Sequence, residues 1–445
     1  MNFDNQLREE WAYTPGPTPE ETWKGLTWEV LVTKDWFSKW LQVEKEFALA
    51  RYRSIIDTED SGEIDYDGVE PGASKPTKAA IRVNDLLETI TERYQPLSSF
   101  SQKIRFLIDI QITIFDLFHE RLHSGLEAYL AMTSTIGRTV QGSGNQPNLQ
   151  GVAGLERLCR IFGSAEYLEM KMQDWSDDVF FLELWYELQD RVEQNTQTGR
   201  PVAGPMSVSD VAARTSSSVA NNGNGDKVEG ALFDETASAY KRLRVRSESV
   251  IVSALVSSIQ SSLRPYSRVS TWASLSTNPE ETVSTPSFDV ANGIRTLSTE
   301  LSFLSQVMAV APLRRVNRQL LLAIQTYIWD NVLMRHTFSA IGVAQLALDV
   351  NALCDAVDAA VRIPDEGESE RVMQKLREGI RLLGLPLTCD PRDSSPNSGF
   401  DLRSAEMGIF ESNESARKVL ARLDMEFLTE AEARAILERR VELRE

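Results

Sequence analysis

The segment "SQKIRFLIDIQITIFDLFHERLHSGLEAYL", residues 101–130, decides the fold because its apolar residues recur with the period of an α-helix. At about 100° per residue, the large apolar side chains fall on one stripe of such a helix. The members of this stripe are Ile104, Leu107, Ile108, Phe115, Phe118, Leu122, Leu126 and Tyr129. The pattern predicts a long amphipathic helix that begins near Ser98 and buries this face in a core.

Helical periodicity recurs along most of the chain. It covers residues 28–56, 75–94, 155–175, 177–192, 233–263, 290–310, 312–334, 339–361 and 368–385, with three short helices in the tail. Pro96 and Pro265 end two of these segments, and Ser176 is a predicted N-cap between two others. No segment combines period-two alternation with hairpin turns. The sequence therefore predicts an all-α protein, an elongated rod of consecutive helical bundles.

The first of these helices, within residues 28–56, has an apolar face of its own. Its members lie three to five residues apart and are Val32, Trp36, Trp40, Val43, Phe47, Ala50 and Ile55. Side chains at this spacing share one side of a helix. We expect this side to be the one that packs into the first bundle.

Composition changes between residues 195 and 230, where Ser, Gly and Asn replace large apolar residues. Such a segment cannot bury enough apolar surface to hold a fixed structure, so we expect a disordered surface loop there. With this insertion, the helical segments divide into three units. They are a bundle with an acidic loop at 1–137, a bundle with the insertion at 138–284, and a C-terminal bundle at 285–445.

Charge and cysteine content exclude several classes of protein. The chain has 65 acidic and 47 basic side chains and a net charge of -18, which disfavours binding to nucleic acid. Its three cysteines stand in no CxxC pair, which is typical of reduced thiols in the cytosol. The N-terminus lacks the features of a signal peptide, and no uninterrupted apolar run approaches the roughly 18 residues of a membrane span. We expect a soluble, cytosolic chain.

The motif His119-Glu120-Arg121-Leu122-His123 matches H-E-x-x-H, the zinc metallopeptidase signature. A zinc enzyme also needs a third protein ligand, and Tyr129 occupies the position of the third histidine in the extended motif. Residues 133–155 offer no Asp, Glu or His, and the chain has only one further histidine, His336. We therefore interpret both histidines as residues at the edge of a core helix and assign no metal or catalytic residue.

The acidic segment "DTEDSGEIDYDG", residues 57–68, resembles an EF-hand loop in part. Position 12 of that loop, where calcium requires a bidentate glutamate, is Gly68, and no exiting helix follows. We interpret the segment as a solvated acidic loop.

Two basic clusters, "YKRLRVRS" at 240–247 and "LRRVNR" at 313–318, could contact phosphate or acidic lipid. On amphipathic helices such clusters more often form solvated faces or contacts with a partner, and no aromatic residues alternate with them to stack on bases. No phosphate-binding loop, nucleophile elbow or dinucleotide-binding motif occurs. No cofactor is expected.

Four long blocks carry more information than their composition. They are "DWFSKWLQVEKEFALARYRSII" at 35–56, residues 75–122, "SAEYLEMKMQDWSDDVFFLELWYELQ" at 164–189 and "FSAIGVAQLALDVNAL" at 338–353. In this order they resemble the RINT/TIP family of vesicle-tethering subunits, a CATCHR-like helical-rod class shared with exocyst and Golgi tethers. The resemblance runs from about Trp28 to the C-terminus.

The resemblance implies a non-enzymatic subunit of the Dsl-type tethering complex, called NRZ in animals. Such a subunit would capture COPI vesicles in Golgi-to-ER retrograde transport and engage ER SNAREs and the other subunits of the complex. It would lie in the cytoplasm, associated with the endoplasmic reticulum membrane through these partners. Family members carry an N-terminal helical region that pairs with a neighbouring subunit, whereas this chain begins almost directly in the later bundles. That pairing therefore stays open.

Two other functions compete with tethering. One is a zinc metallopeptidase that uses residues 119–123, and the other is an interaction protein of the DNA-damage checkpoint, a role reported for the family. The acidic charge gives no support for direct contact with DNA.

Overall fold

The computed structural model describes residues 4, 6, 7, 10–12, 25–34, 36–134, 149–198, 202, 203, 206–217, 230–274, 284–361, 367–387 and 401–444. Over these residues the chain is helical and contains no strand, which confirms the all-α prediction. Three isolated bridges join Ile64 to Thr77, Ala203 to Met206 and Phe338 to Arg440. The chain divides into two compact units, 1–143 with 158–247, and 144–157 with 248–445. The predicted division at 137 and 284 into three bundles stays a prediction.

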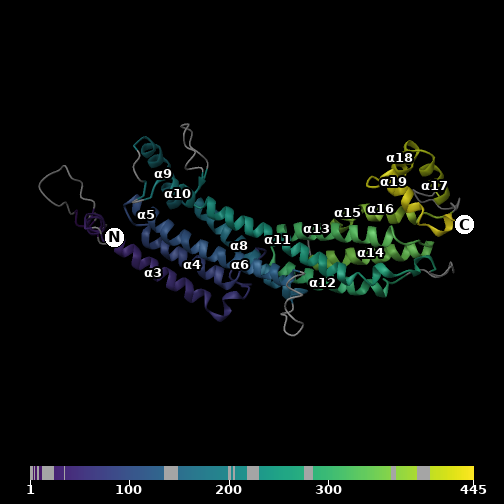
Figure 1. The fold of residues 1–445 in the computed structure, drawn as a ribbon, viewed down its shortest axis with the longest axis horizontal. Helices are drawn as coiled ribbons and strands as arrows, with labels where there is room; N and C mark the ends of the chain where they lie inside the picture. Colours follow the sequence, from purple (N-terminus) through teal and green to yellow (C-terminus); the bar gives the residue numbers. More distant parts are fainter. Residues whose placement is uncertain are drawn as a thin grey trace. The chain divides into compact units, whose positions relative to one another are not determined.

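The helices of the first unit run in chain order from α2 to α11 (Figure 1). They are α2 (Leu26–Trp28), α3 (Phe37–Ile56), α4 (Lys78–Tyr94), α5 (Phe100–Phe106), α6 (Thr113–Thr133), α8 (Val152–Ser176), α9 (Val179–Thr198), α10 (Val208–Arg214) and α11 (Asp234–Ser262). Two π-helices join them, η1 (Glu29–Thr33) before α3 and η3 (Leu107–Ile112) between α5 and α6. The unit boundaries fall within α8 and α11, so both helices contribute to both units.

The continuous run α5–η3–α6 is the central helix that the sequence predicts. Every member of the predicted stripe from Ile104 to Tyr129 is buried. The π-helical turn lies beside a buried polar network: Gln111 Nε2 donates to the Thr91 hydroxyl at 2.5 Å and to the Leu87 carbonyl at 3.1 Å. Gln111 Oε1 accepts from the Tyr94 hydroxyl at 2.5 Å. The buried amide is thus satisfied on both sides, as a polar group in a core must be.

An aromatic cluster joins α6 to the later helices of the first unit. Phe115 meets Trp175, Phe233 and Tyr240 edge to face, with ring centroids 5.9 to 6.1 Å apart. The hydroxyl of Tyr240 donates to the Phe115 carbonyl at 2.8 Å across 125 residues of sequence. These long-range contacts hold the start of α6 against α8 and α11.

The predicted apolar face of the first helix is wrong in part. The helix is interrupted between η1 and α3, and the side that packs consists of Phe37, Leu41, Ala48, Tyr52 and Ile55. Of the predicted face, only Ile55 is buried. Val32, Trp36, Val43, Phe47 and Ala50 are exposed. Both stripes have helical spacing, so periodicity alone could not tell which of them meets α4.

Two further expectations are corrected by local structure. Ser176 is the last residue of α8 and donates to the Met172 carbonyl, whereas the carboxylate of Asp178 accepts from the Phe180 N–H at the start of α9. The insertion at 195–230 also contains order: α9 continues to Thr198, and α10 begins with a capping box between Ser207 and Asp210. The remaining residues of this insertion, at 199–201, 204–205 and 218–229, lie outside the described residues.

The second unit contains the C-terminal helices, with α12 packed against α14 (Figure 1). Its helices are α12 (Phe288–Val307), α13 (Val310–Ile328), α14 (Ala340–Val361), α15 (Glu368–Val372), α16 (Gln374–Leu383), α17 (Leu402–Glu411), α18 (Asn413–Arg422) and α19 (Glu430–Leu437), with the π-helix η7 (Trp329–Leu333) after α13. Helix α14 is long and apolar enough to cross a membrane by length and composition. It packs against α12 and α16, so its apolar residues belong to the core of the second unit.

Candidate functional site

The H-E-x-x-H motif lies on α6, one turn after the buried aromatic ring of Phe115. His119 and His123 are neighbours on the helix, with ring centroids 6.2 Å apart. Burial lowers the pKa of the His119 imidazole, whose ring meets Tyr240 edge to face at 5.3 Å. His123 faces Glu127 at 3.6 Å, and Glu127 is paired with Arg246 at 2.6 Å. The two histidines therefore face different partners.

The described part of the chain shows neither a group of metal ligands nor an activated nucleophile, at the motif or elsewhere. Within it, no three His, Cys, Asp or Glu side chains converge as a metal site requires. Glu120, which would activate water in a peptidase, accepts a hydrogen bond from Ser124 on the same helix. Burial raises the pKa of the Cys354 thiol to about 11, so this cysteine is not a thiolate at neutral pH.

The acidic loop at 57–68 is held by cations from α4. Asp60 forms a bidentate pair with Arg82, both N···O distances being 2.7 Å, and Lys78 pairs with Glu63 at 2.7 Å. The hydrogen bond from Arg82 is the largest effect on the pKa of Asp60 and lowers it to about 2. Asp65 accepts from the backbone N–H groups of Asp67 and Gly68. Of the carboxylates at the ligand positions of an EF-hand loop, Asp65 is therefore used within the protein, whereas the ion pairs with α4 are made by Asp60 and Glu63, at positions 4 and 7.

The basic clusters are also used inside the protein. Arg244 pairs with Glu169 at 2.6 Å and Arg246 pairs with Glu127. In the second cluster, Arg314 pairs with Glu368 at 3.1 Å and Arg315 with Glu248 at 2.8 Å. Each of these guanidinium groups joins two helices within one unit. The sequence predicted solvated faces or contacts with a partner, whereas these four guanidinium groups pair with carboxylates of the chain itself.

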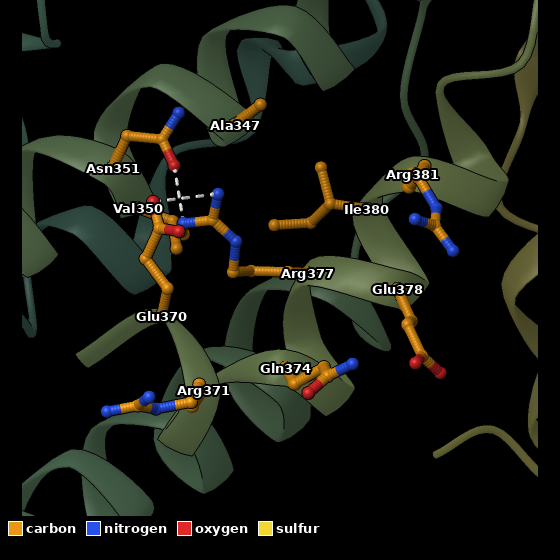
Figure 2. A pocket seen from close by; sticks show the side chains of 10 residues that line it. All are labelled: Ala347, Val350, Asn351, Glu370, Arg371, Gln374, Arg377, Glu378, Ile380 and Arg381. Atoms are coloured by element: carbon orange, nitrogen blue, oxygen red, sulfur yellow. Dashed lines mark hydrogen bonds and ion pairs between the residues drawn. The ribbon is translucent and has the colours of Figure 1, made fainter. Parts of the chain in front are cut away.

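A groove of about 430 Å³ lies in the second unit between α14, α15 and α16. Figure 2 shows Arg377 of α16 reaching between Asn351 of α14 and Glu370 of α15. Arg377 donates to Asn351 Oδ1 at 3.0 Å and pairs with Glu370 at 3.2 Å. The side chains of Val350 and Ile380 add an apolar wall.

Other charged residues at the groove serve the packing of α16 against the C-terminal segment. Glu378 points away from the Arg377 cluster (Figure 2) and accepts from the backbone N–H groups of Glu426 and Phe427. Arg381 donates to the Leu423 and Asp424 carbonyls. The groove holds no nucleophile beside a general base. Its chemistry is that of a binding surface, and the guanidinium group at its centre is held by Asn351 and Glu370.

The chain is similar to known proteins over most of its length. A model of the RINT-1/TIP-1 family matches residues 1–440. The chain belongs to this family. This match confirms the family that the sequence blocks predicted.

One curated protein and one solved structure are similar to this chain. "Protein transport protein tip20" of Schizosaccharomyces pombe is 24% identical over 145 residues, which is 32% of this chain and 20% of that protein. The crystal structure of the SNARE Sec20 bound to the Dsl1 complex subunit Tip20 matches with a TM-score of 0.62 and 19% identity. That match covers 98% of this chain and 62% of the other. This RINT-1/TIP-1 chain therefore shares the helical fold of Tip20 and spans less than two thirds of either relative.

Sequence reasoning named no site residue, and it missed the groove. Asn351, Glu370 and Arg377 come from three helices and share no short motif, so no spacing pattern could have brought them together. The two basic clusters gave a partial signal for the ion pairs between helices, because such clusters on amphipathic helices commonly meet acidic side chains. They gave none for the groove.

Proposed function

We propose that this RINT-1/TIP-1 chain is a non-enzymatic subunit of a vesicle-tethering complex of the Dsl type. The observation that carries the proposal is the family match over residues 1–440, which extends across nearly the whole chain. The fold shared with Tip20, a Dsl1 complex subunit described in complex with the SNARE Sec20, supports it. Packed helical units leave long polar surfaces free for docking, as an interaction protein requires.

We further propose the membrane at which the chain acts and the transport step that it serves. The chain acts at the cytoplasmic side of the endoplasmic reticulum, held there by ER SNAREs and by the other tether subunits. There it helps to capture COPI vesicles that return from the Golgi. No catalytic step is needed, because the free energy of tethering comes from binding. Neither the metallopeptidase nor the checkpoint function has a structural observation in its favour.

Affinity purification of the full chain from its own cells tests this function. We expect ER SNAREs and tether subunits among the recovered proteins, and we expect depletion of the chain to cause secretion of an ER reporter that depends on retrieval. Recovery of neither SNAREs nor tether subunits would count against the proposal. Normal retrieval after depletion would count against the transport step.

The groove between α14 and α16 is the surface on which we place the SNARE contact. A concave surface with a few convergent polar groups is the usual form of a binding site. Arg377→Ala removes the guanidinium at its centre, so we expect less SNARE in the purification. The matched control is Arg403→Ala, which removes the same charge from an exposed position on α17. Equal SNARE recovery with both variants would place the contact elsewhere.

A further inference from the structure

The outward side of α3 carries a row of apolar side chains that the first unit does not bury. Trp36, immediately before α3, is 55% exposed, Val43 is 61% exposed and Phe47 is 51% exposed. Trp40 is partly covered, with its ring centroid 4.9 Å from that of the buried Phe106, and Ala50 continues the row as an exposed residue. Monomeric proteins rarely leave a contiguous apolar patch without a use. This row is the surface that the sequence wrongly placed in the core.

The spacing of this row is that of a coiled-coil seam. Residues 36, 40, 43, 47 and 50 are separated alternately by four and three positions, which is the a/d repeat of a heptad. Trp36, Val43 and Ala50 take the d positions, and Trp40 and Phe47 take the a positions. The buried side of α3 faces α4. The helix therefore has one side for its own bundle and a second side with the pattern of a helix partner.

The charged residues that flank the seam are complementary to those of a second copy of α3. Lys39 and Glu46 occupy g positions, and Glu44 and Arg51 occupy e positions. In a parallel pair of helices, each g residue faces the e residue five positions later on the other helix. If the other helix is α3 of a second copy, Lys39 faces Glu44 and Glu46 faces Arg51. Both cross-pairs are attractive, and the twofold symmetry repeats each of them.

We propose that α3 is a self-association surface, on which a second copy of this chain lays its own α3 in parallel. The seam residues pack at the twofold axis, with Trp36 at one end and Ala50 at the other. Folding of the first unit already fixes α3 as a helix. Association therefore does not bear the cost of helix nucleation that short coiled coils face.

Groups at the rim of the seam are compatible with this arrangement. Lys39 Nζ lies 4.8 Å from the centre of the Trp36 ring, and the Arg93 guanidinium lies 5.1 Å from that of Phe47. Glu44 is paired with Arg93 at 2.7 Å, so Lys39 of the second copy joins an existing ion pair. Glu46 accepts a hydrogen bond from Gln42 on the same exposed side. The Glu46–Arg51 pair therefore sets the orientation most directly.

Sedimentation velocity of the purified full chain is the first test. The proposal expects a mass that rises toward twice the monomer mass between low and high micromolar concentration. Phe47→Glu and Val43→Glu should each abolish this rise, because they place a carboxylate in the seam. Met407→Glu is the matched control, since Met407 is 70% exposed on α17. A chain that stays monomeric, or a dimer that survives Phe47→Glu with unchanged circular dichroism, overturns the proposal.

Charge exchange tests the self-complementarity. Glu46→Arg alone places a cation opposite Arg51 of the second copy, and Arg51→Glu alone places a carboxylate opposite Glu46. Both single variants should weaken the dimer, whereas the double variant should restore it. Equal association of all four proteins would contradict the assigned pairing.

A cysteine at Ala50 tests the orientation. In the parallel arrangement residue 50 faces its own copy across the axis, so Ala50→Cys should give a disulfide-linked dimer on mild oxidation. In an antiparallel pair residue 50 would lie near residue 40 of the other copy, and this link would not form. The described native thiols, Cys159 and Cys354, are buried, and the unsubstituted chain serves as the control. Absence of the link in a chain that dimerises would overturn the parallel arrangement.

Discussion

Gly163 of α8 passes so close to Lys75 that a Cβ built on the glycine would lie 2.1 Å from the Lys75 carbonyl oxygen. Next to this contact, the hydroxyl of Ser164 accepts from the Thr77 N–H at 3.1 Å and lies 2.9 Å from the Thr77 hydroxyl. Thr77 is also the N-cap of α4. One close approach thus joins the segment that precedes α4, the start of α4 and the middle of α8.

Gly163→Ala is expected to destabilise the protein by about 1–3 kcal/mol, because backbone atoms must move apart to admit the new methyl group. Urea unfolding followed by circular dichroism measures this change. Gly125→Ala on α6 is the control, since its nearest neighbour, Ile161 Cδ1, is at an ordinary contact distance of 3.6 Å. That variant should be neutral or gain up to about 1 kcal/mol from helix propensity. Equal effects of both substitutions would contradict the close approach.

The ion pair between Asp60 and Arg82 predicts a specific loss of stability in acid. The pKa of Asp60 is lowered from 3.8 to about 2, so its carboxylate stabilises the folded state above pH 3.8. This contribution is lost as the pH falls through about 2. In Asp60→Asn, unfolding free energy should therefore fall less steeply between these two pH values. Asp67→Asn, which removes an exposed carboxylate from the same loop, should leave the slope unchanged.

Calcium should have no effect on this loop, because Gly68 stands where calcium requires a bidentate glutamate and Asp65 already accepts from two backbone N–H groups. Thermal unfolding curves with calcium and with a chelator are therefore expected to coincide. A rise in the unfolding temperature that Asp57→Asn abolishes, at the first ligand position of the loop, would revive the EF-hand interpretation.

Gln111→Leu tests the buried network at the π-helical turn. The substitution leaves the Tyr94 hydroxyl without its acceptor in a fully buried position, at an expected cost of about 1–3 kcal/mol. Adding Tyr94→Phe removes the stranded hydroxyl as well. The double variant should therefore be less destabilised than the sum of the two single variants, as a double-mutant cycle in urea will measure.

The histidines of α6 should matter less than the phenylalanine beside them. The double substitution His119→Ala and His123→Ala should cost under about 1 kcal/mol, because both rings lie at the margin of the core. Phe115→Ala, by contrast, removes a fully buried ring from the aromatic cluster and should cost about 3–5 kcal/mol. Elemental analysis of the purified protein completes the test. Stoichiometric zinc that His119→Ala removes would support the metallopeptidase.

The sequence predicted those features of the fold that depend on one helix at a time. The stripe from Ile104 to Tyr129 is correct because every member of it is buried. Burial is wider around η3, where Ile110, Gln111 and Ile112 are also covered, and this the spacing did not predict. On α3 two apolar stripes compete, and the positions of α4, α5 and η3 decide that Phe37 and Leu41 are buried while Val43 is not. The groove at Arg377 depends on three helices meeting, which no local pattern encodes.

Glu300 offers a test of electrostatics in the core of the second unit. Its side chain is 3% exposed and accepts from the Ser258 hydroxyl at 2.6 Å. Burial raises the pKa of this carboxyl above its ordinary value of 4.5. A raised pKa means that the folded state favours the protonated form, so the group's contribution to stability is present at low pH and lost as the pH rises through the folded pKa.

Glu300→Gln removes this ionisation while it keeps the shape of the side chain. At neutral pH the variant should be more stable than the native chain, since no charge has to be buried. Below the unfolded pKa the two proteins should become equal. Urea unfolding at a series of pH values measures the difference, with Glu414→Gln on α18 as an exposed control. A loss of stability at neutral pH would mean that the native carboxylate is stabilised in the core by more than the Ser258 hydrogen bond.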